Sequence, residues 1–261
     1  MAKKPTEEIV KLTDFQHHRL RTEMYLGSRN IHTQTVINWD GSRLAAQEVS
    51  WTPAAYCAFR EIFDNSLDEV IGHGHGTKID VSYDPDTLTF GVADDGRGIP
   101  LDWDEDEKMH KATMVLVYPR AGRNFGERGA VRGTNGVGAS CTVHCSQTAT
   151  LTVVRDGKKF VQRFDEPTDI MPELQLSQPR ITTVKGERTG TQIEFRLSHS
   201  VFRHRILPTE FLQARVYEIA ANHPHIRFTF NGERVVTRGN IEKTFFSDAE
   251  VVRVDVQQDT F

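Results

Sequence analysis

The chain has 261 residues, with 32 lysines and arginines against 36 aspartates and glutamates, which gives a formal net charge of −4 at pH 7. This acidic balance argues against a protein that wraps duplex nucleic acid, because such proteins carry a marked basic excess. The 38% hydrophobic and 26% charged content is typical of a globular domain, and no apolar run approaches the roughly 18 residues of a membrane span.

Residues 1–40 are polar and weakly periodic, and they predict no regular element. A helix is predicted from Thr52 to Ile71, because Thr52 and Pro53 suit the N-cap and the first helical position. Glycines follow the predicted helix and end it. Its apolar residues recur at helical spacing on one face: Ala55, Phe59, Ile62, Phe63, Leu67, Val70 and Ile71.

The remaining pattern separates antiparallel hairpins from helices, which indicates an α+β sandwich with helices layered on one face of a sheet. A long glycine-rich loop within it is typical of a functional lid. In chain order we predict strands at 78–83 and 87–93, an acidic stretch at 94–107, a helix at 108–118, the loop at 119–138, strands at 149–154, 158–164 and 190–197, a helix at 209–222, and a hairpin around Asn231 and Gly232.

The polar face of the 52–71 helix carries Glu61, Asp64, Asn65 and Asp68. At about 100° per residue, Asn65 and Asp68 lie roughly 40° and 20° to either side of Glu61. This is either a solvated face, or a Glu and an Asn that orient water and hold a hard cation through oxygen ligands. The stripe contains no Lys or Arg, which favours the second interpretation, because solvent-facing stripes use i,i+4 ion pairs.

Three further segments contain glycine. Asp94 to Pro100, DDGRGIP, is either an Asp–Gly turn or a backbone that approaches a planar ligand whose amine donates to the carboxylate. Gly133 to Ser140, at the start of a predicted helix, is either a flexible loop or a phosphate cradle. Thr189 to Thr191 alone indicates only a turn.

The order of these pieces resembles the GHKL ATPase superfamily, and within it the ATPase region of type II DNA topoisomerases. Residues 60–69, REIFDNSLDE, are similar to the gyrase B pattern FEVVDNAIDE, and residues 21–28, RTEMYLGS, resemble RPxMYIGS. The resemblance covers about residues 10–240. Thr22 stands where the family has proline, and the asparagines at 124 and 135 are closer to eukaryotic and T-even phage enzymes, which favours a phage-type large subunit.

The resemblance implies a Bergerat ATP-binding sandwich with a mixed, mostly antiparallel sheet, and ATP and Mg²⁺ as its ligands. It implies that Glu61 is the general base, that Asn65 holds Mg²⁺, and that Asp94 accepts a hydrogen bond from the adenine amino group. The other nucleotide-binding residues that it implies are Gly96, Gly98, Ile99, Asn124, Gly133, Thr134, Asn135, Gly136, Val137, Gly138 and Thr191.

Other residues have open or structural interpretations. Arg97 is expected either to pair with Glu69 or to contact ligand, and Arg155 either to lie at the pocket rim or to end a hairpin in solvent. His73 and His75 favour a flexible loop over a metal site, and Cys141 and Cys145 favour packing over metal binding.

The resemblance also implies an ATP-driven homodimer that gates DNA strand passage, with DNA and a DNA-cleavage domain or subunit as partners and no membrane. The expected organisation is an N-terminal arm at 1–20, the ATPase domain at 21–240, and the truncated start of a transducer domain at 241–261. Because the family's γ-phosphate lysine belongs to the transducer, weak turnover is expected of this chain. The alternative is a non-topoisomerase GHKL ATPase that acts as a nucleotide-switched clamp or defence protein.

Three cysteines are an odd set that favours reduced thiols over a disulfide framework. The expected location is therefore the cytoplasm, of a bacterium or of a phage-infected host cell.

Overall fold

The structure is a computed structural model, and it describes residues 11–39, 44–121, 136–168 and 173–237. No helix within these ranges is both long enough and apolar enough to cross a bilayer. The expected transducer start at 241–261 lies outside the described residues.

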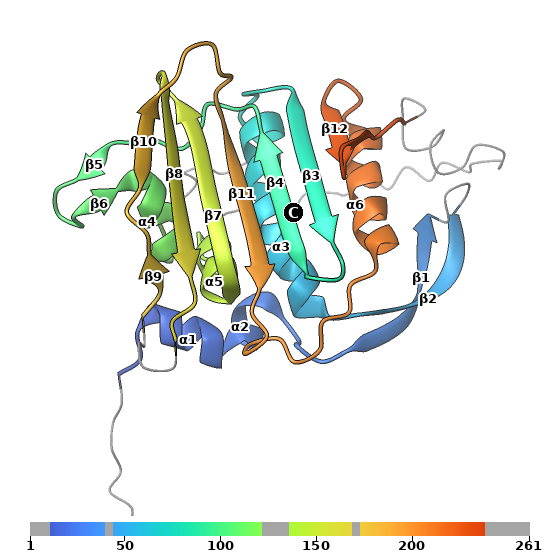
Figure 1. The fold of residues 1–261 in the computed structure, drawn as a ribbon. Coiled ribbons are helices and arrows are strands. Elements are labelled where there is room, and N and C mark those ends of the chain that lie inside the picture. The colour runs from blue at the N-terminus through green and yellow to red at the C-terminus, as the bar shows by residue number, and fades with distance from the viewer. Residues whose placement is uncertain (1–10, 40–43, 122–135, 169–172, 238–261) are drawn as a thin grey trace, which may run out of the picture.

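One nine-stranded sheet forms the framework (Figure 1). Every neighbouring pair is antiparallel except β12 and β3, which are parallel, so the predicted mixed and mostly antiparallel sheet is confirmed. Across the sheet the strands are β10 (Arg180–Thr183), β8 (Lys158–Asp165), β7 (Ser146–Arg155), β11 (Gly190–Leu197), β4 (Thr89–Asp94), β3 (Lys78–Asp84), β12 (Arg227–Phe230) and β13 (Glu233–Arg234), with β9 (Gln175–Leu176) paired to β8.

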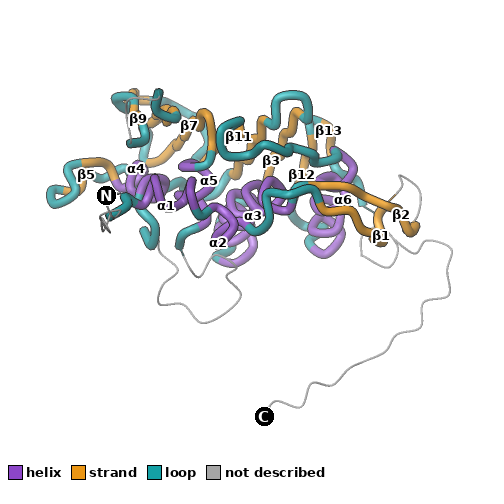
Figure 2. Tube along the Cα trace, turned by 90° about the horizontal axis from the view of Figure 1, so that it is seen from below, coloured by secondary structure: helices purple, strands orange, loops and turns teal. Residues whose placement is uncertain are grey.

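The helices lie along one side of this sheet (Figure 2), as predicted. Their bounds are α3 (Pro53–Leu67), a π-helical turn η1 (Asp68–Gly72), α4 (Lys111–Val117), α5 (Gly138–His144) and α6 (Thr209–Asn222).

The centre of the core is the contact between α3 and the sheet. Phe59 of α3 stacks on Phe90 of β4 with ring centroids 6.0 Å apart, and Phe90 stacks in turn on Phe195 of β11 at 4.9 Å. Thr52 does precede Pro53 at the helix start, but its hydroxyl donates to the carbonyl of His204 and does not cap the helix. Most of the apolar stripe predicted for this helix is confirmed, since Ala55, Phe59, Ile62, Phe63 and Leu67 are at most 1% exposed and Val70 is 2% exposed. Ile71, which lies in η1 beyond the end of α3, is only partly buried.

The N-terminal region has more structure than its polar sequence predicts. It contains α1 (Asp14–Leu20), α2 (Thr22–Leu26) and a hairpin of β1 (His32–Trp39) and β2 (Leu44–Trp51). Thr13 and Gln16 form a reciprocal capping box at the start of α1. Within the arm expected at 1–20, α1 packs on α5 of the same chain through buried Phe15 and His18, whereas residues 1–10 lie outside the described residues.

The acidic stretch is also partly ordered. A short hairpin pairs β5 (Trp103–Asp104) with β6 (Met109–His110), and α4 begins only after it, at Lys111, three residues later than predicted. The Asp104 carboxylate accepts hydrogen bonds from the backbone N–H groups of residues 106 and 107, which folds this acidic sequence into a turn.

Candidate functional site

A cavity of about 610 Å³ opens between α3, the start of α5, and the ends of β4 and β11. We call the apolar side chains of its lining the apolar wall and the polar side chains the polar wall. The apolar wall includes Ile62, Val92, Met114, Leu116 and Ile193, and the polar wall includes Glu61, Asn65, Ser66, Asp68, Asp94 and Thr191.

Glu61 stands on α3 against the first residue of α5. Its Oε1 atom lies 3.3 Å from Nη2 of Arg60 and 3.8 Å from the Cys57 thiol, which donates to it. Its Oε2 atom is so close to Gly138 that a Cβ atom at that position would lie 1.8 Å away. One oxygen of the carboxylate is therefore fixed by Arg60 and Cys57, and the other lies against the first residue of α5.

The predicted row on α3 does face the cavity, since Glu61, Asn65 and Asp68 all line it. Asn65 is exposed within it, whereas Asp68 is only 2% exposed. The row itself contains no Lys or Arg, but the expectation that it lacks i,i+4 ion pairs is wrong, because Arg60 lines the cavity and pairs at 3.8 Å with Asp64 as well as with Glu61. Arg60 lies outside the row, and its long side chain reaches these two carboxylates.

Asp94 ends β4 beneath the apolar wall. Its carboxylate accepts from the hydroxyl of Ser66 at 2.9 Å and from the backbone N–H of Gly96 at 3.0 Å. Burial raises the pKa of Asp94 to about 6, and these hydrogen bonds oppose the increase only in part. Thr191 lies directly opposite Asp94 in the β11–β4 register and lines the same cavity. Thus the two residues that the sequence places 97 positions apart are neighbours.

The two glycines after Asp94 are required by close packing. A Cβ atom at Gly96 would lie 2.4 Å from Cγ of Glu69, and one at Gly98 would lie 2.8 Å from the carbonyl oxygen of Val154. Gly98 and Ile99 line the cavity, whereas Gly96 makes room behind Asp94. Gly98 also has a φ of 76°, which favours glycine.

The structure resolves the open interpretations of the two arginines. Arg97 forms a two-point ion pair with Glu69, through Nε to Oε1 and Nη2 to Oε2, each at 2.9 Å. Arg155 donates from Nη1 to the carbonyl of Gly98 at 2.7 Å. Both arginines therefore hold the 96–99 turn in place.

The glycine-rich loop is described only in part. Gly136, Val137 and Gly138 line the cavity next to Glu61. The other predicted members lie outside the described residues: Asn124, Gly133, Thr134 and Asn135.

Sequence reasoning missed Ser66, which orients Asp94, and Tyr25, which lines the cavity from α2 and bonds through its hydroxyl to Nδ1 of His17. Ser66 adjoins Asn65 in the motif, so its position was available as a signal. Cys141 and Cys145 are buried and free, as expected of packing residues. Within the described ranges no cluster of three or more metal-ligating side chains occurs, at His73 or elsewhere.

The arrangement places a buried hydrogen-bond acceptor under an apolar wall at one end and a carboxylate beside a glycine backbone at the other. Such a cavity suits a flat heterocycle joined to an anionic group.

The chain is similar to proteins of one enzyme class. It is 24% identical to DNA topoisomerase 2 of Candida glabrata over 96% of this chain, and 33% identical to the gyrase B protein of Campylobacter jejuni over 67% of it. It spans 18% and 22% of the length of these two relatives. No protein-family model matches it.

Solved structures give the same result. The ATPase and transducer domains of DNA topoisomerase II from Balamuthia mandrillaris superpose with a TM-score of 0.81 at 27% identity, covering 95% of this chain and 65% of that one. The ATPase region of Saccharomyces cerevisiae topoisomerase II also superposes with a TM-score of 0.81, at 24% identity, over 92% of this chain and 65% of that one.

Proposed function

We propose that this chain, which is homologous to the ATPase regions of type II DNA topoisomerases and has their GHKL fold, binds and hydrolyses ATP. The observation that carries the proposal is the cavity with Asp94 at one end and Glu61, packed on Gly138, at the other. These relatives favour a topoisomerase over a nucleotide-switched clamp of another kind.

The base would bind at Asp94. An ionised Asp94, oriented by Ser66 and the N–H of Gly96, offers an acceptor to the exocyclic amine of adenine. The apolar side chains of the wall would cover the faces of the ring, and Thr191 would add a polar contact beside Asp94. Because Gly98 has no Cβ, the 96–99 turn stays close to the sheet and leaves this end open.

The phosphates would lie between α3 and the glycine segment. Backbone N–H groups at Gly136 to Gly138 would bind the phosphate oxygens, and Glu61 would accept a proton from the attacking water. Arg60 holds the other oxygen of Glu61 and so keeps the carboxylate oriented.

The donor set of the row on α3 fits Mg²⁺. Asn65 offers an exposed amide oxygen within the cavity, and oxygen atoms are the ligands that this hard cation takes. Asn65 would hold the ion, whose charge offsets that of the phosphates when it is bound.

Two variants of the full-length protein test this function. Glu61→Gln should retain binding of a non-hydrolysable ATP analogue and lose ATP hydrolysis by about 100-fold or more, because only proton transfer and water orientation are removed. Asp94→Asn should weaken binding of the analogue, because the amide keeps only one acceptor oxygen, for which the hydroxyl of Ser66, the N–H of Gly96 and the adenine amine would compete. Glu194→Gln, exposed on β11, is the control with the same change of charge. Hydrolysis that persists in Glu61→Gln would contradict the assignment.

We further propose that the whole protein forms a homodimer on ATP binding and passes DNA with the help of a DNA-cleavage domain or subunit. The 261 residues alone should turn over ATP weakly. Light scattering with saturating analogue and Mg²⁺ tests the dimer, and a strictly monomeric species would count against it. Robust Glu61-dependent hydrolysis by the 261 residues would contradict the second expectation.

A further inference from the structure

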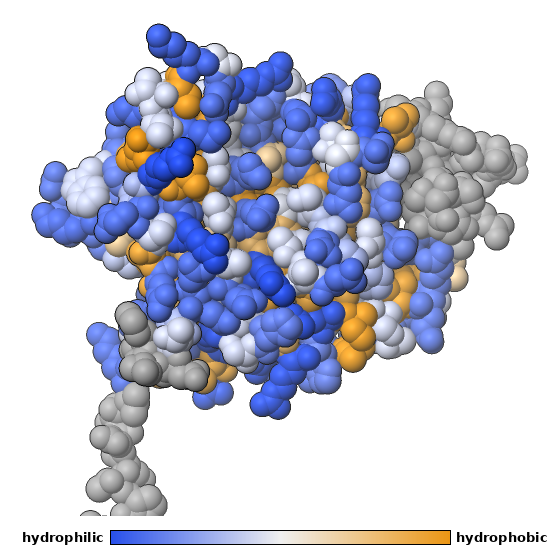
Figure 3. Space-filling view, viewed as in Figure 1, coloured by the Kyte–Doolittle hydropathy of each residue, from blue (hydrophilic) through white to orange (hydrophobic). Residues whose placement is uncertain are grey.

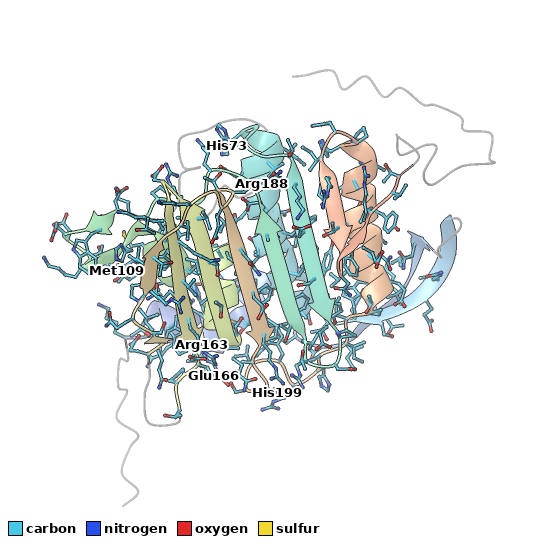
Figure 4. The ribbon with its side chains drawn as sticks, turned by 45° about the horizontal axis from the view of Figure 1, so that its top comes forward. His73, Met109, Arg163, Glu166, Arg188 and His199 are labelled. Atoms are coloured by element: carbon cyan, nitrogen blue, oxygen red, sulfur yellow. The ribbon has the colours of Figure 1, made fainter. Side chains whose placement is uncertain are left out.

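A second, smaller cavity of about 280 Å³ lies at the other end of the sheet from the nucleotide site. Figure 4 shows two of its residues, Arg163 and Glu166, together with His199 at the lower end of the strands, whereas His73 and Arg188 mark the opposite end. This part of the sheet belongs to its open face, which is predominantly hydrophilic in Figure 3. The cavity is lined by Gln147, Thr148, Arg163, Asp165, Glu166 and Arg196.

Three polar atoms of this lining are buried without a hydrogen-bond partner: Nε of Arg196, Oγ1 of Thr148 and Oε1 of Gln147. Arg196 and Thr148 stand directly opposite each other on β11 and β7. Unpaired buried polar atoms are costly, and a buried cation is costlier still. Two of them, Nε of Arg196 and Oγ1 of Thr148, have hydrogens to donate, and two unmet donors in one cavity indicate a ligand that accepts hydrogen bonds. Oε1 of Gln147 is an acceptor, which such a ligand does not complete.

The two carboxylates of the cavity do not neutralise Arg196. Asp165 receives both of its short contacts, 2.9 and 2.8 Å, from Nε of Arg163. Glu166 accepts from Arg19 at 3.0 Å and from the hydroxyl groups of Ser198 and Ser200. Among the described residues the side chain of Arg196 makes neither a hydrogen bond nor an ion pair, although its charge acts on Asp84 across β4. The two arginines and two carboxylates of the lining balance each other, and Arg19, which pairs with Glu166 from outside the lining, leaves Arg196 as the cation without an ion-pair partner, beside the hydroxyl of Thr148.

The rim of the cavity adds to this charge. The segment 198–208, between β11 and α6, holds two histidines, His199 and His204, and no acidic side chain, and its positive charge at pH 7 comes from Arg203 and Arg205. His199, Arg203 and His204 are exposed, and Arg205 contacts Nε2 of His199 at 2.7 Å. Slight burial and then the charges of Arg205 and Arg196 lower the pKa of His199, as a positive local potential does.

We propose that this cavity is a phosphate-binding site separate from the nucleotide pocket, with Arg196 and Thr148 as its donors. Free phosphate and the phosphodiester backbone of duplex DNA share the chemistry that these donors recognise. The exposed basic rim favours the backbone, because a single phosphate needs no further cations around the cavity whereas a duplex brings neighbouring phosphates within their reach. The net charge of −4 thus conceals a local basic surface.

The test uses Arg196→Gln and Thr148→Val, with Arg188→Gln as the matched control. Arg188 is 82% exposed at the opposite end of the sheet, and its substitution changes the net charge by the same amount. Binding of a short fluorescent duplex is measured by anisotropy without nucleotide at several salt concentrations. Arg196→Gln should weaken binding about tenfold and make the salt slope shallower by about one unit. Thr148→Val should weaken it several-fold at unchanged charge, and Arg188→Gln should do neither.

A second measurement separates binding from folding and identifies the source of the phosphate. Without ligand, Arg196→Gln should unfold at a temperature no lower than the wild type, because Arg196 is half-buried and the Nε–H group that is removed has no hydrogen-bond partner to lose. Duplex DNA should raise the unfolding temperature of the wild type but not of Arg196→Gln, whereas millimolar inorganic phosphate should have little effect on either. Equal losses in Arg196→Gln and Arg188→Gln would overturn the site. Stabilisation by inorganic phosphate without duplex binding would overturn the assignment to DNA. Because the assays contain no ATP, their failure is distinguishable from failure of the proposed ATPase.

Discussion

Gly138 packs so closely against the Glu61 carboxylate that there is no room for the methyl group of an alanine at position 138. A Cβ at Gly138 would lie 1.8 Å from Oε2 and 2.5 Å from Cδ of Glu61. The position of the carboxylate is therefore coupled to the position of α5, which begins at this glycine.

We expect Gly138→Ala to displace Glu61. ATP hydrolysis by the full-length protein should fall at least about tenfold, which corresponds to roughly 1.4 kcal/mol of transition-state stabilisation. The affinity for the analogue should change much less, since Asp94 at the other end of the cavity is untouched. Steady-state hydrolysis and analogue titration check both quantities. Equal losses of rate and affinity would show that the contact serves folding of the glycine segment and does not position Glu61.

The ionised Asp94 should lower the free energy of unfolding at neutral pH. Because burial raises its pKa from 3.8 to about 6, the folded chain binds this proton more tightly than the unfolded chain does. The contribution of Asp94 to stability therefore falls as pH rises from about 3.8 to about 6. Asp94→Asn should unfold at a higher temperature than wild type at pH 8, and this advantage should shrink as the pH falls from about 6 and vanish near 3.8. A variant that is less stable at pH 8 would contradict the shifted pKa as the dominant effect.

The ion pair of Glu69 and Arg97 should contribute measurably to stability, because Glu69 is only 8% exposed and also accepts from the backbone N–H of Arg97. Glu69→Gln should lower the free energy of unfolding by roughly 1–3 kcal/mol in urea titrations. Glu105→Gln is the control, since its pair with Lys108 is 81% and 72% exposed, and its effect should stay within about 0.5 kcal/mol. Similar values for both variants would show that burial adds nothing to the Glu69 pair.

Acid should weaken the contact between α1 and α5. His18 and His144 meet through their Nδ1 atoms at 2.9 Å, and burial, as the largest cause, lowers their pKa values from 6.5 to about 4 and about 3. Because the unfolded chain takes up protons first, the stability that this pair contributes is complete above pH 6.5 and is lost progressively as pH falls towards 4.

Urea titrations at pH 7.5 and 5.0 measure this loss. The double variant His18→Gln, His144→Gln should lose less stability over that interval than the wild type does. The free energy of unfolding of the double variant should then be higher at pH 5.0 than at pH 7.5, because the raised pKa of Asp94 acts in the opposite direction to the histidines. An unchanged difference between the two pH values would refute the role of the histidines.

Agreement with the predicted bounds varies among the elements: the helix predicted to Ile71 ends as an α-helix at Leu67 and continues as the π-helical turn, which helical spacing does not distinguish. The strand Gly190–Leu197 and the helix Thr209–Asn222 were predicted at their observed bounds, because alternation and helical spacing are unambiguous there. The hairpin β1–β2 was missed, because its apolar residues do not alternate regularly with polar ones. Among those of its side chains that the structure describes, Val49 is the one hydrophobic residue in the buried core.

The order of the motifs and the family resemblance joined Glu61, Asn65 and Asp94 in one hypothesis. The structure brings these three residues to one cavity, and their roles stay a prediction. The contacts around them were not predicted. Contacts such as Ser66 with Asp94, 28 residues apart, depend on strand register and helix rotation, which a single sequence does not encode locally. The pairing of Arg60 with Glu61 was missed for a different reason, because it depends on the direction of a long side chain.

One consequence of α3 concerns how this protein can change over evolutionary time. The same helix carries the innermost core contacts on one side and the polar row on the other. A substitution that shifts the helix in the core therefore also shifts the polar row in the cavity. A larger side chain at Ala58, which is fully buried and whose carbonyl accepts from Thr142 of α5, would lift Glu61 and Asn65 together. We therefore expect new ligand preferences to arise in the segments that border the cavity, while α3 tolerates few changes on either face.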